Sequence, residues 1–179
     1  AEHLAEDAPM AEADMIIEAA TEKEAIKQAI FEDAGKELSD TAILASNTSS
    51  IPITRMANFS PDPARFIGLH FFNPVAQLPL VEVIRCEDTD AAALDSAFAF
   101  VKAIGKFPLE CKSSPGFVVN RILAPYMAEA MILAEDDVSL TSIDDAAVRF
   151  GMPMGPIELI DTVGLDVARQ VSDVLGAAF

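Results

Sequence analysis

The chain has 179 residues, of which 51% are hydrophobic, and its 29 acidic and 12 basic residues give a formal net charge of −17. This acidic balance argues against nucleic acid and against an anionic membrane surface as partners, because both attract basic proteins. No apolar run reaches the roughly 18 residues of a membrane span, so we expect no membrane partner. The length allows one domain, or one small domain with part of another.

The chain contains two cysteines, Cys86 and Cys111, and two histidines, His3 and His70. They are far apart in the sequence and show no metal-ligand spacing, so we predict no metal site. The first residues are acidic and polar, unlike a secretory signal peptide. We therefore expect reduced thiols and a cytoplasmic location.

The first predicted elements are a strand and a helix. Residues 14–19 form a short apolar run that predicts a buried strand. Thr21 followed by Glu24 is a capping-box pattern, which predicts a helix over 21–38. The apolar residues that share one side of this helix at helical spacing are Ala25, Ile26, Ala29, Ile30 and Ala34.

Four further strands and two helices follow before the linker-like segment. The run 41–46 predicts a strand that leads into a polar loop, and a short helix is predicted within 51–59, where Pro52 is tolerated in the first turn. Further predicted elements are strands at 68–72 and 80–84, an amphipathic helix over 90–105 and a strand at 106–111. The strands are apolar without alternation, which favours a mostly parallel sheet covered by helices.

His70 and Glu82 lie in the adjacent strands 68–72 and 80–84, separated by a turn at Asn73-Pro74. Their side chains can face each other, and an imidazole oriented by a carboxylate is an arrangement for general acid–base chemistry. From these residues alone the alternative is a hydrogen-bonded core histidine and a glutamate at a solvated sheet edge. Ligands bind at the carboxyl ends of strands in open α/β sheets, and both the 46–50 loop and the segment after His70 lie at such ends.

The second half changes to helices after the linker-like segment 112–116. We predict an apolar helix over 117–136 bent at Pro125, a helix over 140–150 capped by Thr141 or Ser142, and a helix from 157 that breaks at Gly164. The predicted fold class is α/β, a truncated Rossmann-like parallel sheet followed by an all-α C-terminal domain. The predicted boundaries are 1–113 and 114–179.

Four motifs in order resemble the 3-hydroxyacyl-CoA dehydrogenase family. They are SNTSSIPIT at 46–54, GLHFFNPVAQLPLVEVI at 68–84, SPGFVVNRILAPYMAEA at 114–130 and PMGPIELIDTVGLD at 153–166. The resemblance extends over nearly the whole chain from Asp14 onward. Within the family the chain looks most similar to the dehydrogenase segment of multifunctional fatty-acid β-oxidation chains, with stand-alone 3-hydroxybutyryl-CoA dehydrogenases as the nearest competitors.

The resemblance implies a reaction, the NAD-dependent and reversible oxidation of an L-3-hydroxyacyl-CoA to a 3-ketoacyl-CoA. His70 matches the family's catalytic base, and Glu82 matches the carboxylate that orients it. Ser49 and Asn73 match residues that contact substrate and cofactor, and Asn120 matches a substrate contact. Without the resemblance, Ser49 would be a loop hydroxyl bonded to its own backbone and Asn73 a turn residue before proline.

The resemblance also implies cofactor contacts next to the first predicted strand. Ala20, Thr21 and Glu22 match a cofactor-binding turn, and Lys27 matches a further cofactor contact. Judged without the family, Glu22 and Lys27 would be a solvated charge pair on a helix.

The glycine-rich phosphate cradle of the family is missing from this sequence, which contains no G-x-G-x-x-G. We therefore expect the chain to begin about halfway through the dinucleotide-binding domain and to bind NAD weakly or not at all. The absent unit would leave a sheet edge exposed, which favours a homo-oligomer. Other β-oxidation domains are expected in the parent chain.

Two alternatives remain open at this point. The chain could be a non-catalytic structural or interaction relative of the same fold, or a dehydrogenase of small hydroxy acids. The joint presence of His70, Glu82, Ser49, Asn73 and Asn120 argues against the first alternative. The HFFNP and FVVNR motifs argue against the second.

Overall fold

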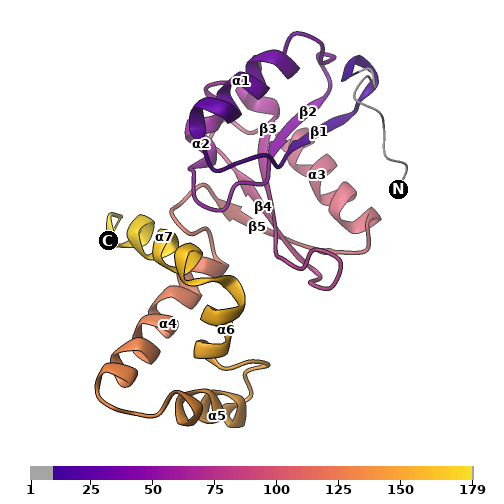
Figure 1. Cartoon of the computed structure of the whole chain (residues 1–179). Helices are drawn as coiled ribbons and strands as arrows, with labels where there is room; N and C mark the ends of the chain where they lie inside the picture. The colour runs from indigo at the N-terminus through magenta and orange to yellow at the C-terminus, as the bar shows by residue number, and fades with distance from the viewer. Residues whose placement is uncertain (1–9, 179) are drawn as a thin grey trace. The chain divides into compact units, whose positions relative to one another are not determined.

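The computed structural model describes residues 10–178 (Figure 1). The chain divides into two units, which meet in the sequence between Ser114 and Pro115. The first unit holds the whole sheet, and the second consists of helices. This arrangement confirms the predicted fold class, a mostly parallel sheet with helices followed by an all-α region.

The sheet of the first unit has five strands in the spatial order β1-β2-β3-β4-β5. The strands are β1 (Met15–Glu18), β2 (Ile43–Ser46), β3 (Phe66–Phe71), β4 (Leu80–Arg85) and β5 (Phe107–Lys112). Strands β1, β2 and β3 are parallel, β4 runs antiparallel to β3, and β5 is parallel to β4. The carboxyl ends of β1 to β3 and the start of β4 therefore lie at the same edge of the sheet.

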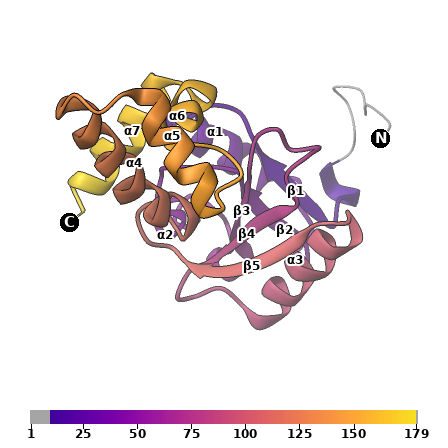
Figure 2. The ribbon, with the colours of Figure 1, turned by 90° about the horizontal axis from the view of Figure 1, so that it is seen from below.

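Helices cover both faces of this sheet (Figures 1 and 2). They are α1 (Glu24–Ala34), α2 (Ile53–Ala57) and α3 (Ala91–Ala103), and two short 3-10 helices, η1 (Met10–Glu12) and η2 (Pro63–Arg65), complete the unit. On one face α3 buries Ala93, Ala97 and Val101 against the aliphatic side chains of the strands. On the other, Phe31 of α1 packs edge-to-face on Phe66 of β3, with ring centroids 5.0 Å apart.

Gly68 in β3 allows α2 to approach the sheet closely. A Cβ atom at this position would lie 2.8 Å from side-chain atoms of Ile53 in α2 and of Ile84 in β4. Both isoleucines are fully buried. Because Gly68 has no side chain, α2 can pack close to the strand that carries His70. The polar loop that precedes α2 is thereby held near this strand.

The predicted capping box at Thr21 is wrong. Helix α1 begins at Glu24 with Lys23 as its N-cap residue, and the Thr21 hydroxyl accepts a hydrogen bond from the Lys23 amide at 3.2 Å. The predicted inner face is also wrong in part, since Ala25, Ile26 and Ala29 are exposed. The buried residues of α1 are Lys27, Phe31 and Ala34. Lys27 can be buried because it has a charged partner inside the unit.

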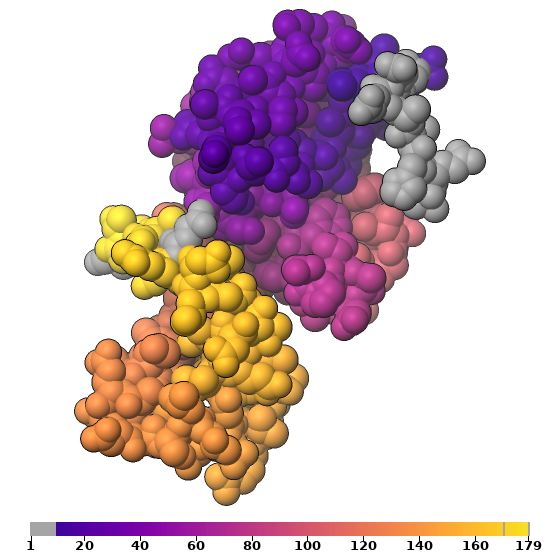
Figure 3. Space-filling view, in the orientation of Figure 1, coloured from indigo at the N-terminus to yellow at the C-terminus, as the bar shows by residue number. Residues whose placement is uncertain are grey.

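The second unit contains α4 (Val119–Glu135), α5 (Leu140–Phe150), α6 (Pro156–Val163) and α7 (Leu165–Gly176). These helices pack on one another and form the orange and yellow body of Figure 3. The predicted break at Gly164 is confirmed, and Pro125 lies inside α4 as expected. No helix among the described residues combines the length and the apolar character needed to cross a membrane.

The α5–α6 contact depends on Asp144, which replaces a missing cap. Gly155 is the N-cap residue of α6 and has no side chain to offer. The Asp144 carboxylate of α5 accepts hydrogen bonds from the backbone amides of Ile157 at 2.8 Å and Glu158 at 3.1 Å. The cap of α5 itself is Ser139, whose hydroxyl accepts from the Ser142 amide, so the predicted caps Thr141 and Ser142 are wrong by two or three positions.

Candidate active site

His70 and Glu82 are brought together by the pairing of β3 and β4, in which they are direct cross-strand neighbours. The Nδ1 atom of His70 lies 2.7 Å from Oε2 of Glu82. The two residues are 4% and 0% exposed, so the contact lies inside the unit. Directly opposed residues on adjacent strands have neighbouring side chains, which is why twelve positions of sequence close into one hydrogen bond.

The other nitrogen of His70 faces the loop after β2. Its Nε2 atom lies 3.0 Å from the Ser49 hydroxyl, and its ring meets the ring of Phe72 edge-on, with centroids 4.6 Å apart. When the Glu82 carboxylate is ionised it only accepts hydrogen bonds, and the imidazole proton then lies on Nδ1 and the lone pair on Nε2. In this tautomer Ser49 donates to Nε2, and Nε2 is the atom that could take a proton from a bound alcohol.

The loop 47–51 that carries Ser49 is held by two of its own side chains. The Oδ1 atom of Asn47 accepts from the Phe71 amide at 2.9 Å, next to His70. The Thr48 hydroxyl accepts from the Ile51 amide at 3.1 Å. Neither Asn47 nor Thr48 was identified from the sequence as part of the site, although their position between a buried strand and a proline-containing turn marks a structured loop.

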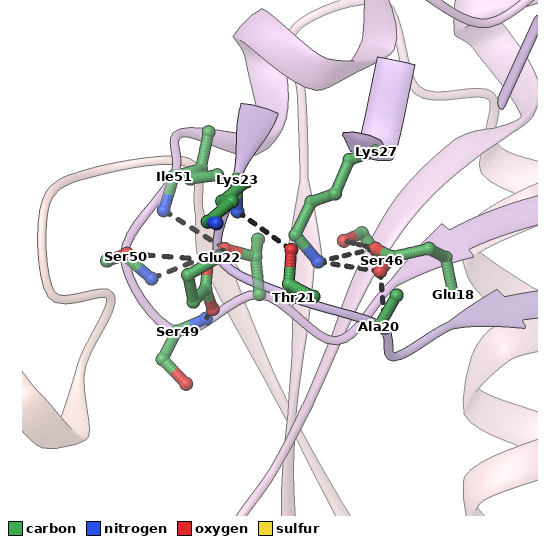
Figure 4. Close-up of polar contacts among 11 residues, drawn as sticks. Glu18, Ala20, Thr21, Glu22, Lys23, Lys27, Ser46, Ser49, Ser50 and Ile51 are labelled. Atoms are coloured by element: carbon green, nitrogen blue, oxygen red, sulfur yellow. Dashed lines mark hydrogen bonds and ion pairs between the residues drawn. The ribbon is translucent and has the colours of Figure 1, made fainter. Parts of the chain in front are cut away.

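Glu22 binds this same loop from the turn after β1. Its Oε2 atom accepts from the Thr48 hydroxyl at 2.7 Å, and its Oε1 atom accepts from the Ser49 amide at 2.7 Å (Figure 4). The carboxylate therefore connects two strand-end segments that are 27 residues apart. A solvated pair between Glu22 and Lys27, the alternative to a cofactor role, is wrong because each side chain has other partners.

Lys27 forms a buried ion pair with Glu18, the last residue of β1. Its Nζ atom lies 2.7 Å and 2.6 Å from the two carboxylate oxygens, and the two residues are 2% and 4% exposed. The Ser46 hydroxyl donates to the same carboxylate at 2.7 Å. Burial raises the pKa of Glu18, but the hydrogen bonds from Lys27, Ser46 and the Ala20 amide outweigh it and hold the pKa below its ordinary value.

Asn73 lies in the exposed segment between β3 and β4, at a cis Asn73–Pro74 peptide bond. Lys106 fixes this segment, because its Nζ atom donates to the carbonyl oxygens of Val75 at 2.5 Å and Leu78 at 2.8 Å. Asn120, the remaining predicted substrate contact, lies half-buried in the first turn of α4, in the second unit.

Three groups from three segments thus converge at one edge of the sheet: Ser49, His70 and Glu82. The turn at 20–22 reaches the same loop through Glu22. Within residues 10–178 there is no cluster of three or more histidine, cysteine or acidic side chains that could hold a metal ion.

Two family models match the chain over nearly its full length. Residues 3–114 match the NAD-binding domain of 3-hydroxyacyl-CoA dehydrogenase, and residues 116–179 match the C-terminal domain of the same family. Among curated proteins, the fatty acid oxidation complex subunit alpha of Acinetobacter baylyi is 42% identical over 168 residues. The match covers 94% of this chain and 23% of that protein, so the chain spans about a quarter of its relative's length.

Solved structures of similar fold have comparable identity. FadB2 of M. tuberculosis matches with a TM-score of 0.91 and 41% identity, covering 95% of this chain and 61% of the other. The (S)-3-hydroxybutyryl-CoA dehydrogenase PaaH1 of Ralstonia eutropha matches with a TM-score of 0.91 and 42% identity over the same shares of the two chains. With both of its units matched by the corresponding models, this chain belongs to the 3-hydroxyacyl-CoA dehydrogenase family.

Proposed function

We propose that the chain carries the dehydrogenase chemistry of an enzyme that reversibly oxidises an L-3-hydroxyacyl-CoA to the 3-ketoacyl-CoA with NAD, in fatty-acid β-oxidation. The observation that carries this proposal is the continuous chain of contacts from Ser49 through His70 to Glu82, at 3.0 Å and 2.7 Å, in a member of this family. The relatives named for fatty-acid oxidation support the pathway.

His70 acts as the base in the oxidation. Its Nε2 lone pair takes the proton of the 3-hydroxyl group as the carbon–hydrogen bond at the same carbon breaks and the carbonyl forms. Glu82 accepts a hydrogen bond from the Nδ1–H group of His70, which fixes the tautomer, and its charge stabilises the positive charge that the imidazole gains. Ser49 orients the substrate oxygen at Nε2, and Asn73 and Asn120 supply further substrate contacts.

The residues at this edge suit the nicotinamide end of NAD, which accepts the hydride when it is bound. Ala20 and Thr21 are exposed residues of the turn at the carboxyl end of β1. Ligands of α/β sheets bind at such strand ends. Glu22, Ser49 and Asn73 supply polar groups beside it. Lys27 is 2% exposed and bound to Glu18, so it contributes by supporting this turn.

The binding partners that we propose for the chain are a coenzyme A thioester and a second copy of the chain. Exposed apolar side chains support association, with Phe150 89%, Leu165 66% and Ile122 65% exposed. We also propose that the parent protein carries other β-oxidation domains, since the curated relative is a subunit of a fatty acid oxidation complex. The two buried cysteines, which do not form a disulfide, support the cytoplasmic location.

The test follows the ring nitrogens of His70 by NMR while acetoacetyl-CoA is added. A His3→Gln background removes the only other imidazole of the sequence and serves as the control. We expect the thioester to shift the Nε2 resonance, and the residual rate of NADH oxidation to fall about 10²- to 10⁴-fold in His70→Gln. A shift caused by a small hydroxy acid and not by the thioester would overturn the substrate class. No shift with either compound would overturn an enzymatic role for His70.

A further inference from the structure

The Glu18 carboxylate joins three segments at the edge of the sheet (Figure 4). Its Oε1 atom accepts from the Ala20 amide at 2.7 Å, and its Oε2 atom accepts from the Ser46 hydroxyl at 2.7 Å. Both oxygens contact the ammonium group of Lys27. The carboxylate thus connects the turn after β1, the end of β2 and helix α1.

The contact with Ala20 restrains the turn that carries Glu22. Only the exposed residues Ala19, Ala20 and Thr21 lie between Glu18 and Glu22, and the Ala20 amide is bound to the Glu18 side chain two positions earlier. Glu22 in turn accepts from the Ser49 amide, and the Ser49 hydroxyl lies 3.0 Å from His70. A continuous set of contacts therefore runs from Glu18 through the turn and the loop to the imidazole.

Lys27 compensates the buried charge of Glu18 in the folded state. A buried carboxylate without a partner is unfavourable, and an ammonium group at 2.6 Å removes that cost. The ion pair by itself does not require the contact to Ala20, since both Glu18 oxygens reach Lys27 independently of it. Glu18 therefore does two separable things: it pairs with the charge of Lys27, and it accepts a hydrogen bond from the Ala20 amide.

We propose that Glu18 is a positioning residue, which sets the turn at 20–22 and through Glu22 holds Ser49 at His70. This inference rests on the proposed function only for its consequence in catalysis. The positional claim concerns groups of this chain alone and is tested on the protein without cofactor.

Two variants separate the acceptor from the charge. Glu18→Gln/Lys27→Met and Glu18→Leu/Lys27→Met both remove the buried ion pair, and apolar or neutral replacement of such a pair is often tolerated. Only the glutamine variant keeps an oxygen that can accept from Ala20 and Ser46. Asp33→Asn is the control, because Asp33 lies on the same helix, α1, and the substitution breaks only its exposed pair with Lys36.

The readouts are amide hydrogen exchange at Ala20 and Ser49, the ring nitrogen resonances of His70, and the urea midpoint of unfolding. We expect the leucine variant to exchange about tenfold faster at both amides, as loss of a hydrogen bond to a carboxylate predicts, and to shift the Nε2 resonance. The glutamine variant and Asp33→Asn should stay near the wild type, even where the two double variants have equal urea midpoints.

Three results would overturn the proposal. The first is a folded leucine variant with unchanged exchange and an unchanged His70 resonance, which would leave Glu18 a purely structural residue. The second is an equal displacement in both double variants, which would assign the turn to the ion pair. If the leucine variant does not fold, Ser46→Ala is used instead. It removes one hydrogen bond to the Glu18 carboxylate and leaves the ion pair with Lys27 in place. The third result that would overturn the proposal is unchanged amide exchange at Ala20 and Ser49 in Ser46→Ala.

The failure of the proposed function looks different from the failure of this inference. If wild-type His70 responds to no thioester while the leucine variant still displaces Ser49, the positional claim stands and the enzymatic assignment falls. If His70 responds to acetoacetyl-CoA equally in the wild type and in the leucine variant, the enzymatic assignment stands and Glu18 has no positioning role.

Discussion

The buried carboxylate of Glu18 makes the stability of the fold depend on pH in the acidic range. Its pKa lies below the ordinary 4.5, because the hydrogen bonds it accepts outweigh the opposing effect of burial. A carboxyl group with a pKa lowered by folding contributes stability that is complete above its unfolded pKa and is lost as the pH falls through its folded pKa. Urea unfolding should therefore show stability falling below about pH 4.5, with a shallower fall in Glu18→Gln/Lys27→Met. Equal slopes in the two proteins would contradict this role.

Cys111 is a residue whose environment suppresses its reactivity. Burial raises the pKa of its thiol to about 12, and the nearby carboxylates of Glu82 and Glu110 act in the same direction. Because the thiolate is the reactive form, we expect iodoacetamide to leave Cys111 unmodified in the folded protein at neutral pH. Mass spectrometry of the labelled protein checks this, with the urea-unfolded chain as the positive control. Rapid labelling before unfolding would refute it.

At the scale of elements, helix α6 depends on a cap that another helix supplies. A Cβ atom at Gly155 would lie 2.2 Å from Oδ1 of Asp144, the acceptor for the first amides of α6. We expect Gly155→Ala to displace this carboxylate and to lower the free energy of unfolding by about 1–2 kcal/mol, the range for a lost cap. Denaturant unfolding measures the loss.

Gly176→Ala is the matched control for that substitution. A Cβ atom there meets nothing within 4 Å, and the residue ends α7. Alanine is a better helix former than glycine, so this variant should be neutral or slightly more stable. Equal destabilisation by the two substitutions would show that the Asp144 contact is not the cause.

The order and type of the elements could be predicted from apolar runs and their breaks, as the strand at β2 and the helix break at Gly164 illustrate. The start of α1 could not be predicted in this way. Its capping-box pattern is local, whereas the actual turn is set by Glu18 and by Glu22 through contacts to a distant loop. Asp144 was missed for the same reason, because its partners lie 13 and 14 residues away.

The residues of the candidate site divide along the same line. His70 and Glu82 were identified as a pair on adjacent strands and Ser49 by its motif, and the pairing of β3 with β4 accounts for the proximity of His70 and Glu82. The role of Glu22 as a link to the Ser49 loop depends on side-chain direction, which periodicity does not specify. Asn47 was missed because an asparagine after a strand reads as a turn residue, whereas here it binds the backbone beside His70.

At the scale of the whole molecule, the chain combines a net charge of −17 with a sequence that contains no G-x-G-x-x-G. Backbone amides at a helix N-terminus are the usual anchor for a pyrophosphate, and an acidic protein does not attract an anionic ligand over distance. We therefore expect calorimetric titration of this chain with NADH to give no binding in the micromolar range.

Acetoacetyl-CoA is the comparison ligand in that experiment. Thioester binding that is lost in Asn120→Ala, together with absent NADH binding, is the expected pair of results. Micromolar affinity for NADH would mean that this chain rebuilds a dinucleotide site without the glycine-rich motif, and the expectation of weak binding would then be wrong.

The antiparallel register of β3 and β4 has a consequence for how such a protein can diverge. A shift of pairing by one residue would turn Glu82 to the opposite face of the sheet, away from His70. The contact between the imidazole and its carboxylate therefore depends on the register of the whole β3–β4 pair. Under the proposed function, substitutions in the surrounding loops would change substrate preference, while His70 and Glu82 would keep their geometry for as long as the register holds.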